Sequence, residues 1–273
     1  MYGVTFNQET NSLYLDKHDC GLLSNASVTM KSLLTLHETI SKPIKVFWPY
    51  SSIWNKSDRI ERNVYELYFK TLSVANVVVK PDVYFNAMIG DCGRFNFSDL
   101  ETIRDTYFYF SDDVQNRRRA FIEKYNINFE RTIAILYRGT DKILEVPKID
   151  PKYYVSCLSG IKDIASYKIL LQTDQQQILE YFEKQFKNQL VHIEEMPITK
   201  TMQVIHNLSE TEKGLSNYEL GMNYLAAISI LSKCKYVVFD TNNAGLWVCI
   251  LRGSLQNTCQ VHADIHIFNR FEG

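Results

Sequence analysis

The side chains best suited to bind an anion stand together in one run, Arg138-Gly139-Thr140-Asp141-Lys142. The run directly follows residues 133–137, whose β-branched and aromatic side chains predict a buried strand. Ligands of open α/β sheets bind at the carboxyl ends of the strands. An arginine there can bind a phosphate through two parallel hydrogen bonds, and its charge is permanent. Gly139 would let the backbone approach a ligand closely. Asp141 could orient the cations of Arg138 and Lys142, or accept a proton. The structural alternative is a turn in which Asp141 caps a helix or pairs with Lys142.

Two more polar clusters follow predicted strands. Thr173-Asp174 ends the strand predicted at residues 167–172, and the run 240–245 (Asp-Thr-Asn-Asn-Ala-Gly) ends the strand predicted at 235–239. Parallel strands bring such ends to one edge, so the three clusters predict a single crevice. Small polar residues before a helix can offer backbone N–H groups to a phosphate. Alternatively, Asp174 only caps the next helix and Asn242-Asn243 only form a turn. The chain has no GxGxxG and no GxxxxGK[ST] motif, so neither a standard dinucleotide site nor a P-loop is expected.

The elements that would position these clusters alternate between strand and helix, which predicts parallel pairing. Strands are predicted at residues 13–15, 44–48, 77–79, 132–137, 167–172, 190–193 and 235–239. Helices are predicted from Val28 to Ile40, with Asn25 or Ser27 as the cap, and at 58–72, 113–125, 151–161, 175–187, 219–233 and 246–252. Loops and short helices are expected between residues 86 and 112.

Composition narrows the class of protein. The chain has 273 residues, of which 45% are hydrophobic, so a packed core is expected. A formal net charge of -1 argues against a nucleic-acid partner bound by phosphate neutralisation. Apolar runs are too short for a membrane span, and residues 1–7 show no signal peptide, so a cytoplasmic protein is expected. The six cysteines form no CxxC pair, and Cys234 and Cys249 are predicted to be buried thiols.

The order of these motifs resembles the three-motif pattern of the inverting fucosyltransferase superfamily, which includes α1,6- and α1,2-fucosyltransferases, the Nod-factor enzyme and protein O-fucosyltransferases. The pattern covers residues 130–255 and includes Ser-Lys-Cys-Lys-Tyr-Val-Val at 232–238. Residues 21–25 are similar to the first glycine loop of the family. The resemblance implies an α/β fold of the GT-B type, in which two Rossmann-like domains with mostly parallel sheets face each other across a cleft. Residues 1–125 would form the acceptor-side domain and residues 126–273 the nucleotide-sugar-binding domain.

The resemblance also implies roles for individual residues. Arg138 matches the arginine that binds the diphosphate and stabilises the leaving group, and Asp141-Lys142 match the Asp-Lys pair of the family. Asp174 matches an acidic residue near the nucleotide. The residues expected to bind the nucleotide sugar are Arg138, Gly139, Thr140, Lys142, Thr173, Asp174, Thr241, Asn242 and Asn243. Gly21 and Asn25 are expected on the acceptor side.

Several positions depart from the family pattern. Leu136 stands where the family has histidine, and Gly139 replaces its second arginine. Ala227 replaces an acidic residue that reads the base. Val146 replaces a glutamate, although Glu145 is adjacent. These departures weaken the expectation of GDP and fucose, so a UDP-sugar donor such as UDP-xylose is the alternative.

The predicted reaction is transfer of a sugar, with inversion, from a nucleoside diphosphate sugar to a glycan hydroxyl. Arg138, with Lys142, would stabilise the departing diphosphate. Glu145 is the first candidate for the base and Asp141 the second. No metal and no other cofactor are expected, because cations are available and no DxD motif occurs. Trp48, Tyr50 or Trp54 could stack on an acceptor sugar. The rival hypotheses are a non-catalytic nucleotide or carbohydrate binding module and a Rossmann-like regulatory protein. Nothing in the sequence indicates the oligomeric state.

Overall fold

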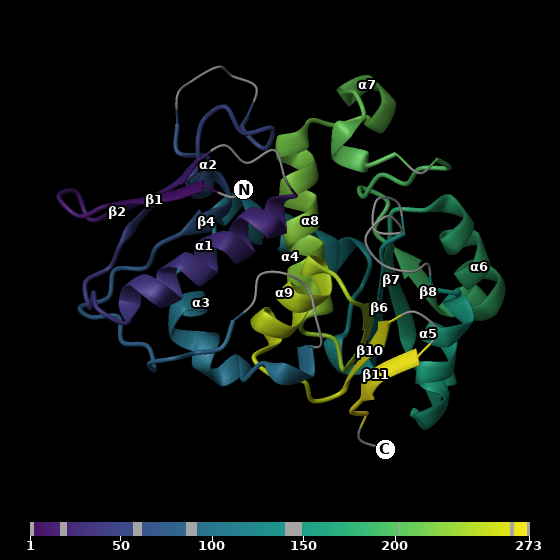
Figure 1. The fold of residues 1–273 in the computed structure, drawn as a ribbon. Coiled ribbons are helices and arrows are strands. Elements are labelled where there is room, and N and C mark those ends of the chain that lie inside the picture. Colours follow the sequence, from purple (N-terminus) through teal and green to yellow (C-terminus); the bar gives the residue numbers. More distant parts are fainter. Residues whose placement is uncertain are drawn as a thin grey trace.

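The computed structural model describes residues 3–16, 21–56, 62–85, 92–139, 149–201, 203–262 and 265–271. The described chain has an α/β fold with a six-stranded sheet, a three-stranded sheet and a two-stranded ribbon, and the helices lie around and between them (Figure 1). The predicted α/β class is therefore confirmed, and the arrangement of the second half positions the candidate site.

The large sheet has six strands, and five of them are parallel. Their order is β11 (Ile265–Asn269), β10 (Thr258–His262), β9 (Tyr236–Asp240), β6 (Thr132–Tyr137), β7 (Lys168–Thr173) and β8 (Leu190–His192). Only β11 runs antiparallel to its neighbour. Every residue of β6 is buried, as expected for a continuous apolar strand with both faces covered. The predicted strands at 132–137, 167–172, 190–193 and 235–239 are confirmed to within one residue at each end.

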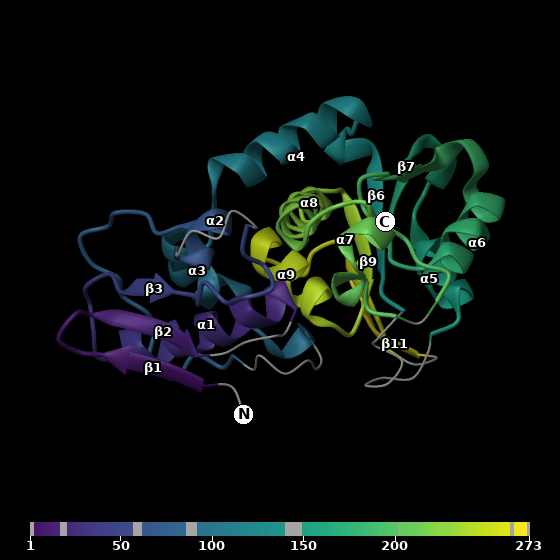
Figure 2. The same ribbon diagram turned by 90° about the horizontal axis from the view of Figure 1, so that it is seen from above.

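Helices cover both faces of the large sheet (Figure 2). On one face, Ile133 and Ile135 of β6 share a core with α5 (Pro151–Cys157) and α6 (Gln176–Phe186). On the other face, Ala134 and Leu136 of β6 share a core with α8 (Asn217–Leu231) and α9 (Asn243–Arg252). This alternation, with both faces covered, explains why residues 133–136 of β6 are all apolar.

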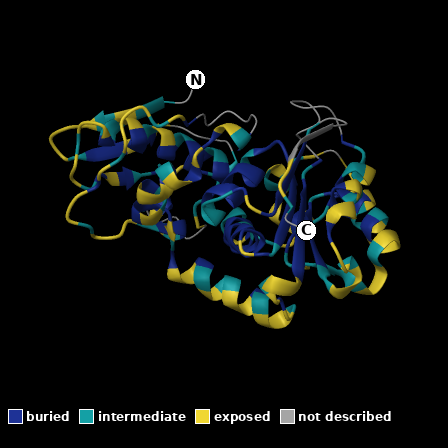
Figure 3. Ribbon diagram, turned by 90° about the horizontal axis from the view of Figure 1, so that it is seen from below, coloured by how far each residue is buried: buried dark blue, intermediate teal, exposed yellow. Residues whose placement is uncertain are grey.

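Local sequence signals explain where these helices begin. Asp150 caps α5 by accepting a hydrogen bond from the N–H of Lys152 at 3.0 Å, and Pro151 follows in the first turn. Ser216 and Glu219 form a reciprocal capping box at the start of α8. Helices α8 and α9 are buried on nearly all sides, whereas α4 (Asp112–Lys124) and α6 expose their outer faces (Figure 3).

The small sheet contains β1 (Gly3–Asn7), β2 (Ser12–Asp16) and β3 (Lys45–Phe47). Strands β2 and β3 are parallel, but β1 pairs with β2 in the antiparallel sense. The predicted strands at 13–15 and 44–48 are confirmed as a parallel pair, whereas β1, an antiparallel edge strand with no buried residue, was not predicted.

Helix α1 (Leu22–His37) begins earlier than the sequence indicated. Its N-cap is Gly21, and Asn25 and Ser27 lie inside the helix with 1% and 0% of their surface exposed. The prediction that one of these two residues caps the helix is therefore wrong. Polar side chains look like caps in a sequence, but here they face other buried groups of the core.

Two other predictions in the first half fail. Residues 77–79 form no strand, since Val77 donates its N–H to the carbonyl of Ser41 at 2.7 Å and Val78 is 70% exposed. In the described part of 58–72, the helix is only α2 (Val64–Tyr68). It leads into β4 (Phe69–Lys70), which pairs with β5 (Tyr109–Phe110).

The remaining elements agree better with the sequence. Helix α4 confirms the helix predicted at 113–125, and α3 (Glu101–Tyr107) is one of the short helices expected before it. Helix α7 (Glu210–Lys213) is a single turn. Cys234 and Cys249 are fully buried free thiols, as predicted. In the part of the chain that is described, no helix combines the length and apolarity needed to span a membrane.

Candidate functional site

Three polar strand ends meet at one edge of the large sheet. Tyr137, the last residue of β6, is paired with Thr173 of β7, and Leu136 is paired with Phe239 of β9. This register places the residues that follow each strand side by side. The connections from β6 lead first to β7 on one side and later to β9 on the other, so the β6–β9 border is a topological switch point. Ligands of open parallel sheets bind at such a point.

Two carboxylates hold the turn that follows β6. The N–H of Arg138 donates to Oδ2 of Asp240 at 3.2 Å, and the N–H of Gly139 donates to Oδ1 of Asp174 at 3.1 Å. Both acids therefore shape the backbone at the start of the charged motif. Asp174 was predicted to lie near this motif, whereas Asp240 was recognised only as the first residue of a polar run.

The guanidinium of Arg138 lies at the same sheet edge, where the sequence predicts the crevice. Its Nε is 3.7 Å from Oδ2 of Asp174, and its Nη1 donates to the hydroxyl of Tyr224 on α8 at 3.4 Å. The side chain of Arg138 is 23% exposed and that of Asp174 is 14% exposed. The cation is thus neither buried away from a ligand nor extended into solvent. It occupies a position from which a phosphate entering the crevice could be bound through charge-assisted hydrogen bonds.

Asp240 is the most deeply buried acid of the crevice, with 3% of its surface exposed. The pKa of Asp240 is raised to about 7, mainly by burial and to a lesser degree by the nearby charge of Asp174. The N–H and the positive charge of Arg138 act in the opposite direction. Asp240 also accepts a hydrogen bond from Nδ2 of Asn242. Near neutral pH this carboxyl group is consequently able to change its charge next to the backbone of Arg138.

Gly139 packs closely against neighbouring side chains. A Cβ atom at this position would lie 2.3 Å from Oε1 of Gln175 and 2.9 Å from a ring carbon of Tyr137. Gln175 is buried at 1% exposure, and its backbone N–H donates to Oγ1 of Thr173 at 3.3 Å. Sequence reasoning assigned Gly139 to close approach of a ligand. The structure adds an intramolecular reason, because Gln175 occupies the space that a side chain would need.

The turn after β9 is held by its own side chains. Asn242 caps α9, with Oδ1 accepting from the N–H of Gly245 at 2.9 Å. Oγ1 of Thr241 accepts from Nε2 of Gln260 on β10 at 2.9 Å. Asn242 and Thr241 are 2% and 7% exposed. Both therefore have a structural role at the crevice, and their predicted contact with the nucleotide sugar stays a prediction.

Asn243 connects the crevice to the first turns of α1. Its Nδ2 donates to Oγ of Ser24 at 2.8 Å, and its Oδ1 accepts from Oγ of Ser27 at 3.3 Å. The indole of Trp247, one turn further along α9, donates to the carbonyl of Leu23 at 3.1 Å and to Oγ of Ser27. These bonds bring the segment 21–27, where Gly21 and Asn25 were expected to contact an acceptor, next to the turn after β9.

Some predicted residues lie outside the described part of the chain. These are Thr140, Asp141, Lys142 and Glu145, so the roles assigned to them stay predictions. Among the described residues, no group of three or more His, Cys, Asp or Glu could hold a metal ion.

Sequence reasoning missed several residues that shape the site. Tyr224 belongs to a helix that reads as an apolar stripe, so nothing marked its hydroxyl as a partner of Arg138. Gln260 is fully buried, and its Oε1 accepts from the N–H of Cys92 at 3.0 Å. Gln260 lies in a segment for which no strand or helix was predicted, so nothing in the sequence marked it as a residue of the site. The polar run that begins at Asp240 was the one available hint.

Comparison with solved structures finds partial similarity to fucosyltransferases. The α1,6-fucosyltransferase NodZ soaked with GDP-fucose has 16% sequence identity and a TM-score of 0.40, over 60% of this chain and 49% of that chain. NodZ from Bradyrhizobium has 14% identity and a TM-score of 0.39, over 61% and 49% of the two chains. A mutant of Arabidopsis thaliana FUT1 in complex with GDP has 13% identity and a TM-score of 0.38, over 62% and 36%.

The chain thus matches about half or less of the length of these structures. Searches with protein-family models and against curated proteins found no match.

Proposed function

We propose that this chain is a glycosyltransferase that moves a sugar from a nucleoside diphosphate sugar to a glycan hydroxyl, with inversion and without a metal ion. The observation that carries the proposal is the position of Arg138. Its half-buried guanidinium lies at the switch point of a parallel sheet, 3.7 Å from Asp174 and in contact with Tyr224. A fixed, permanent cation at this edge is suited to a diphosphate.

The proposed reaction follows from where charge develops. The acceptor oxygen attacks the anomeric carbon, the bond from that carbon to the diphosphate oxygen breaks, and negative charge grows on the leaving diphosphate. A guanidinium already held in place by its surroundings stabilises that charge more in the transition state than in the ground state. The acceptor proton passes to a base, for which Glu145 is the first candidate and Asp141 the second. Lys142 would assist Arg138.

The proposal extends to the architecture and the donor. Residues 1–125 would form the acceptor-side domain and 126–273 the donor-binding domain of a GT-B fold, with a cleft between them. The donor is a GDP-sugar or a UDP-sugar such as UDP-xylose. Support for the donor side comes from Thr173, Asp174 and the 241–243 turn, which border the same sheet edge as Arg138.

A second candidate function is a binding module without transferase activity. The contact between Arg138 and Asp174 favours it, because an arginine already paired with a carboxylate presents less net positive charge to a diphosphate. In that case the crevice would bind a nucleotide but would not promote transfer.

Thermal melting in the presence of GDP, UDP and CDP tests the proposal. A nucleotide that binds only the folded protein must raise the melting temperature. We expect one diphosphate to do so in the wild type and in Lys124→Gln, a surface control, but much less in Arg138→Gln. The proposal fails if no nucleotide shifts the melting temperature, or if the shift is equal in Arg138→Gln.

Transfer assays then separate the two candidate functions. The wild type is incubated with sugars carried on the nucleotide that shifts the melting temperature, in the presence and absence of EDTA. Release of the nucleoside diphosphate that is unaffected by EDTA supports a metal-independent transferase. Binding without any release supports the non-catalytic module.

A further inference from the structure

A second hollow lies at the carboxyl ends of β2 and β3 in the small sheet, apart from Arg138. It has a volume of about 460 Å³, within the usual range of small-molecule sites. Aromatic and apolar groups make up most of its lining, with few polar atoms among them. The residues that matter here are Tyr14, Asp16, Phe47, Trp48, Tyr50 and Arg62.

Two exposed tyrosines border the hollow. Tyr14 is 38% exposed and stacks on Phe47, its cross-strand partner, with ring centroids 5.0 Å apart and an angle of 12° between the rings. Tyr50, just after β3, is 56% exposed. The core of the small sheet is made instead by residues such as Leu13 on the opposite face of β2. Tyr14 and Tyr50 thus offer aromatic surface that the fold itself does not bury.

The floor of the hollow is fixed by Asn63. Its Oδ1 accepts from the N–H of Trp48 at 3.0 Å and from that of Tyr65 at 3.2 Å, while its Nδ2 donates to the carbonyl of Val46 at 2.7 Å. Trp48 is itself 2% exposed, with its indole N–H bound to Oγ1 of Thr29 at 3.0 Å. These bonds hold the wall in one shape, which lowers the ordering cost of binding a ligand.

The charges around the hollow favour a neutral ligand. Asp16 is exposed and accepts from Oγ1 of Thr5 at 2.6 Å, so its carboxylate is oriented at the strand end. A phosphate or another anion would meet this negative charge. Arg62 lines the hollow as well, so neither sign of charge prevails. Apolar faces combined with hydrogen-bonding edges and no net charge describe a saccharide ring.

A chain of contacts connects the loop after β3 to α8. The chain after β3 reaches Trp54, whose carbonyl accepts from the hydroxyl of Tyr68 at 2.7 Å. The ring of Tyr68 contacts that of Tyr218 in the first turn of α8, with centroids 6.0 Å apart. Tyr224, which contacts Arg138, is six residues further along α8, a rise of roughly 9 Å. The loop that follows β3 is thus connected through Tyr68 to the first turn of α8, the helix that also carries Tyr224.

We propose that this hollow binds a saccharide ring of the acceptor glycan, with Tyr14 and Tyr50 stacking on the ring and Asp16 and Arg62 binding its hydroxyl groups. The inference rests on the proposed function, because a transferase to a glycan needs a site for the acceptor. Of the three aromatic residues predicted to stack on an acceptor sugar, Trp48 and Trp54 are buried at 2% and 3% exposure, so the stacking role falls to Tyr50, joined by Tyr14.

Saturation-transfer NMR with five disaccharides tests the inference. Cellobiose, maltose, lactose, chitobiose and mannobiose are added one at a time to the full chain. We expect saturation transfer to at least one of them, and roughly tenfold weaker binding in Tyr50→Ala, the loss expected when a stacked ring is removed. Arg62→Gln should also weaken binding. Tyr109→Ala is the matched control, because Tyr109 is a comparably exposed tyrosine (45%) on β5.

The inference is overturned if none of the disaccharides binds, or if binding is equal in the wild type, Tyr50→Ala and Arg62→Gln. Failure of the proposed function would appear differently. The nucleotide melting shift reports on the Arg138 crevice alone, so disaccharide binding without any nucleotide shift would remove the transferase proposal and leave a saccharide site. A nucleotide shift without disaccharide binding would remove the saccharide site and leave the transferase proposal standing.

Discussion

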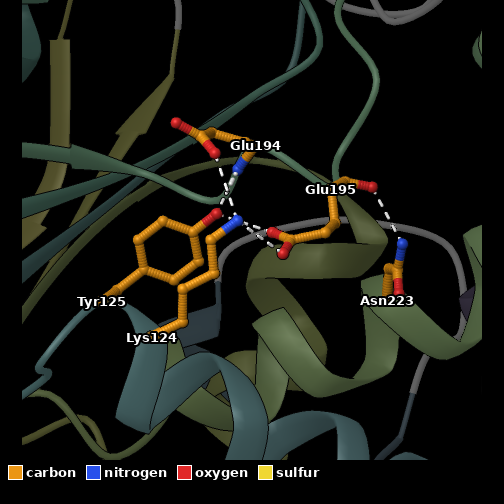
Figure 4. A network of polar contacts seen from close by, with 5 residues as sticks. All are labelled: Lys124, Tyr125, Glu194, Glu195 and Asn223. Carbon is orange, nitrogen blue, oxygen red and sulfur yellow. Dashed lines mark hydrogen bonds and ion pairs between the residues drawn. The ribbon is translucent and has the colours of Figure 1, made fainter.

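Two cations of this molecule each lie near two carboxylates, but their surroundings differ. Lys124 at the end of α4 binds Glu194 at 3.1 Å and Glu195 at 2.9 Å (Figure 4). Arg138 at the end of β6 lies beside Asp174 and Asp240. The side chain of Lys124 is 47% exposed, against 23% for Arg138. The first arrangement is a surface network, and the second forms the floor of a crevice.

The two clusters also use their acids differently. Both glutamates accept directly from the ammonium of Lys124, and Glu195 accepts from the hydroxyl of Tyr125 at 2.6 Å as well. The network is completed by Asn223 of α8, which donates to the carbonyl of Glu195 at 2.8 Å. It ties the end of α4 to the segment after β8 and to α8. The ammonium of Lys124 is therefore neutralised by the two glutamates that it links.

In the crevice, each acid accepts a hydrogen bond from a backbone N–H group of the turn after β6, and Asp240 also accepts one from the side chain of Asn242. Asp240 and Asp174 accept from the N–H groups of Arg138 and Gly139, which fixes the turn while the guanidinium extends past it toward Tyr224. The difference teaches that a count of ion pairs does not separate a structural cluster from a binding cluster. What separates them is burial and the atoms to which the acids are bonded.

The largest expected effect is at Arg138. We expect Arg138→Ala to lower the turnover of sugar transfer by a factor of about 10² to 10³, which corresponds to roughly 3–4 kcal/mol of lost transition-state stabilisation. The turnover of Arg138→Lys should lie between those of the wild type and Arg138→Ala, because an ammonium keeps the charge but lacks the planar fork of a guanidinium. Steady-state kinetics measure both. Near-normal turnover of Arg138→Ala would show that Arg138 does not stabilise the departing diphosphate. The contrast drawn between Arg138 and Lys124 would then be wrong.

The next effect is the pH dependence of folding stability caused by Asp240. Because its pKa is raised from 3.8 to about 7 in the fold, the folded protein holds a proton that the unfolded chain releases between these values. The stabilising contribution is therefore complete below about pH 4 and is lost as the pH rises toward 7, by at most about 1.4 kcal/mol per pH unit. Asp240→Asn cannot titrate. Urea denaturation at several pH values should show the wild type losing stability relative to Asp240→Asn over this range, and parallel curves would disprove the assignment.

A smaller effect is expected at Gly139. The Cβ of Gly139→Ala must displace the buried side chain of Gln175, which should cost about 1–3 kcal/mol of the free energy of unfolding. The matched control is Gly160→Ala, where a Cβ would meet no atom within 4 Å. Urea denaturation at pH 7 compares the two. Equal stability of both variants would mean that a Cβ atom at position 139 causes no steric clash with Gln175.

The smallest effect is expected in the surface network. Lys124→Ala should leave nucleotide binding unchanged and lower the melting temperature only slightly, with a difference that shrinks further in high salt. Thermal melting at low and high salt measures this. A large, salt-independent loss would show that exposure does not distinguish the two clusters.

The buried parallel sheet was the part of the fold most open to prediction. Short, continuous apolar runs such as residues 132–137 leave few alternatives once helices alternate with them. Because the carboxyl ends of parallel strands meet at one edge of the sheet, Arg138 was expected next to Asp174 and the turn after β9, where the structure has it. In contrast, β10 was missed because Thr258 and Gln260 look like loop residues. Both are fully buried and hydrogen-bonded, a condition that depends on partners distant in the sequence.

Errors in the first half have a related cause. Val77, Val78 and Val79 have strand propensity, but propensity does not say whether a neighbouring strand is available. Asn25 and Ser27 resemble caps, yet Ser27 bonds to Asn243 and Trp247, more than 200 positions away. Partners so far apart along the chain are invisible to local patterns.

The most direct measurement compares how wild type and Arg138→Gln discriminate a nucleoside diphosphate from its nucleoside. Calorimetry would give Kd values for GDP and guanosine, and for UDP and uridine. If Arg138 binds the diphosphate, the preferred diphosphate should bind roughly 100-fold more tightly than its nucleoside in the wild type, and most of this ratio should vanish in Arg138→Gln. An unchanged ratio in the variant would contradict the account.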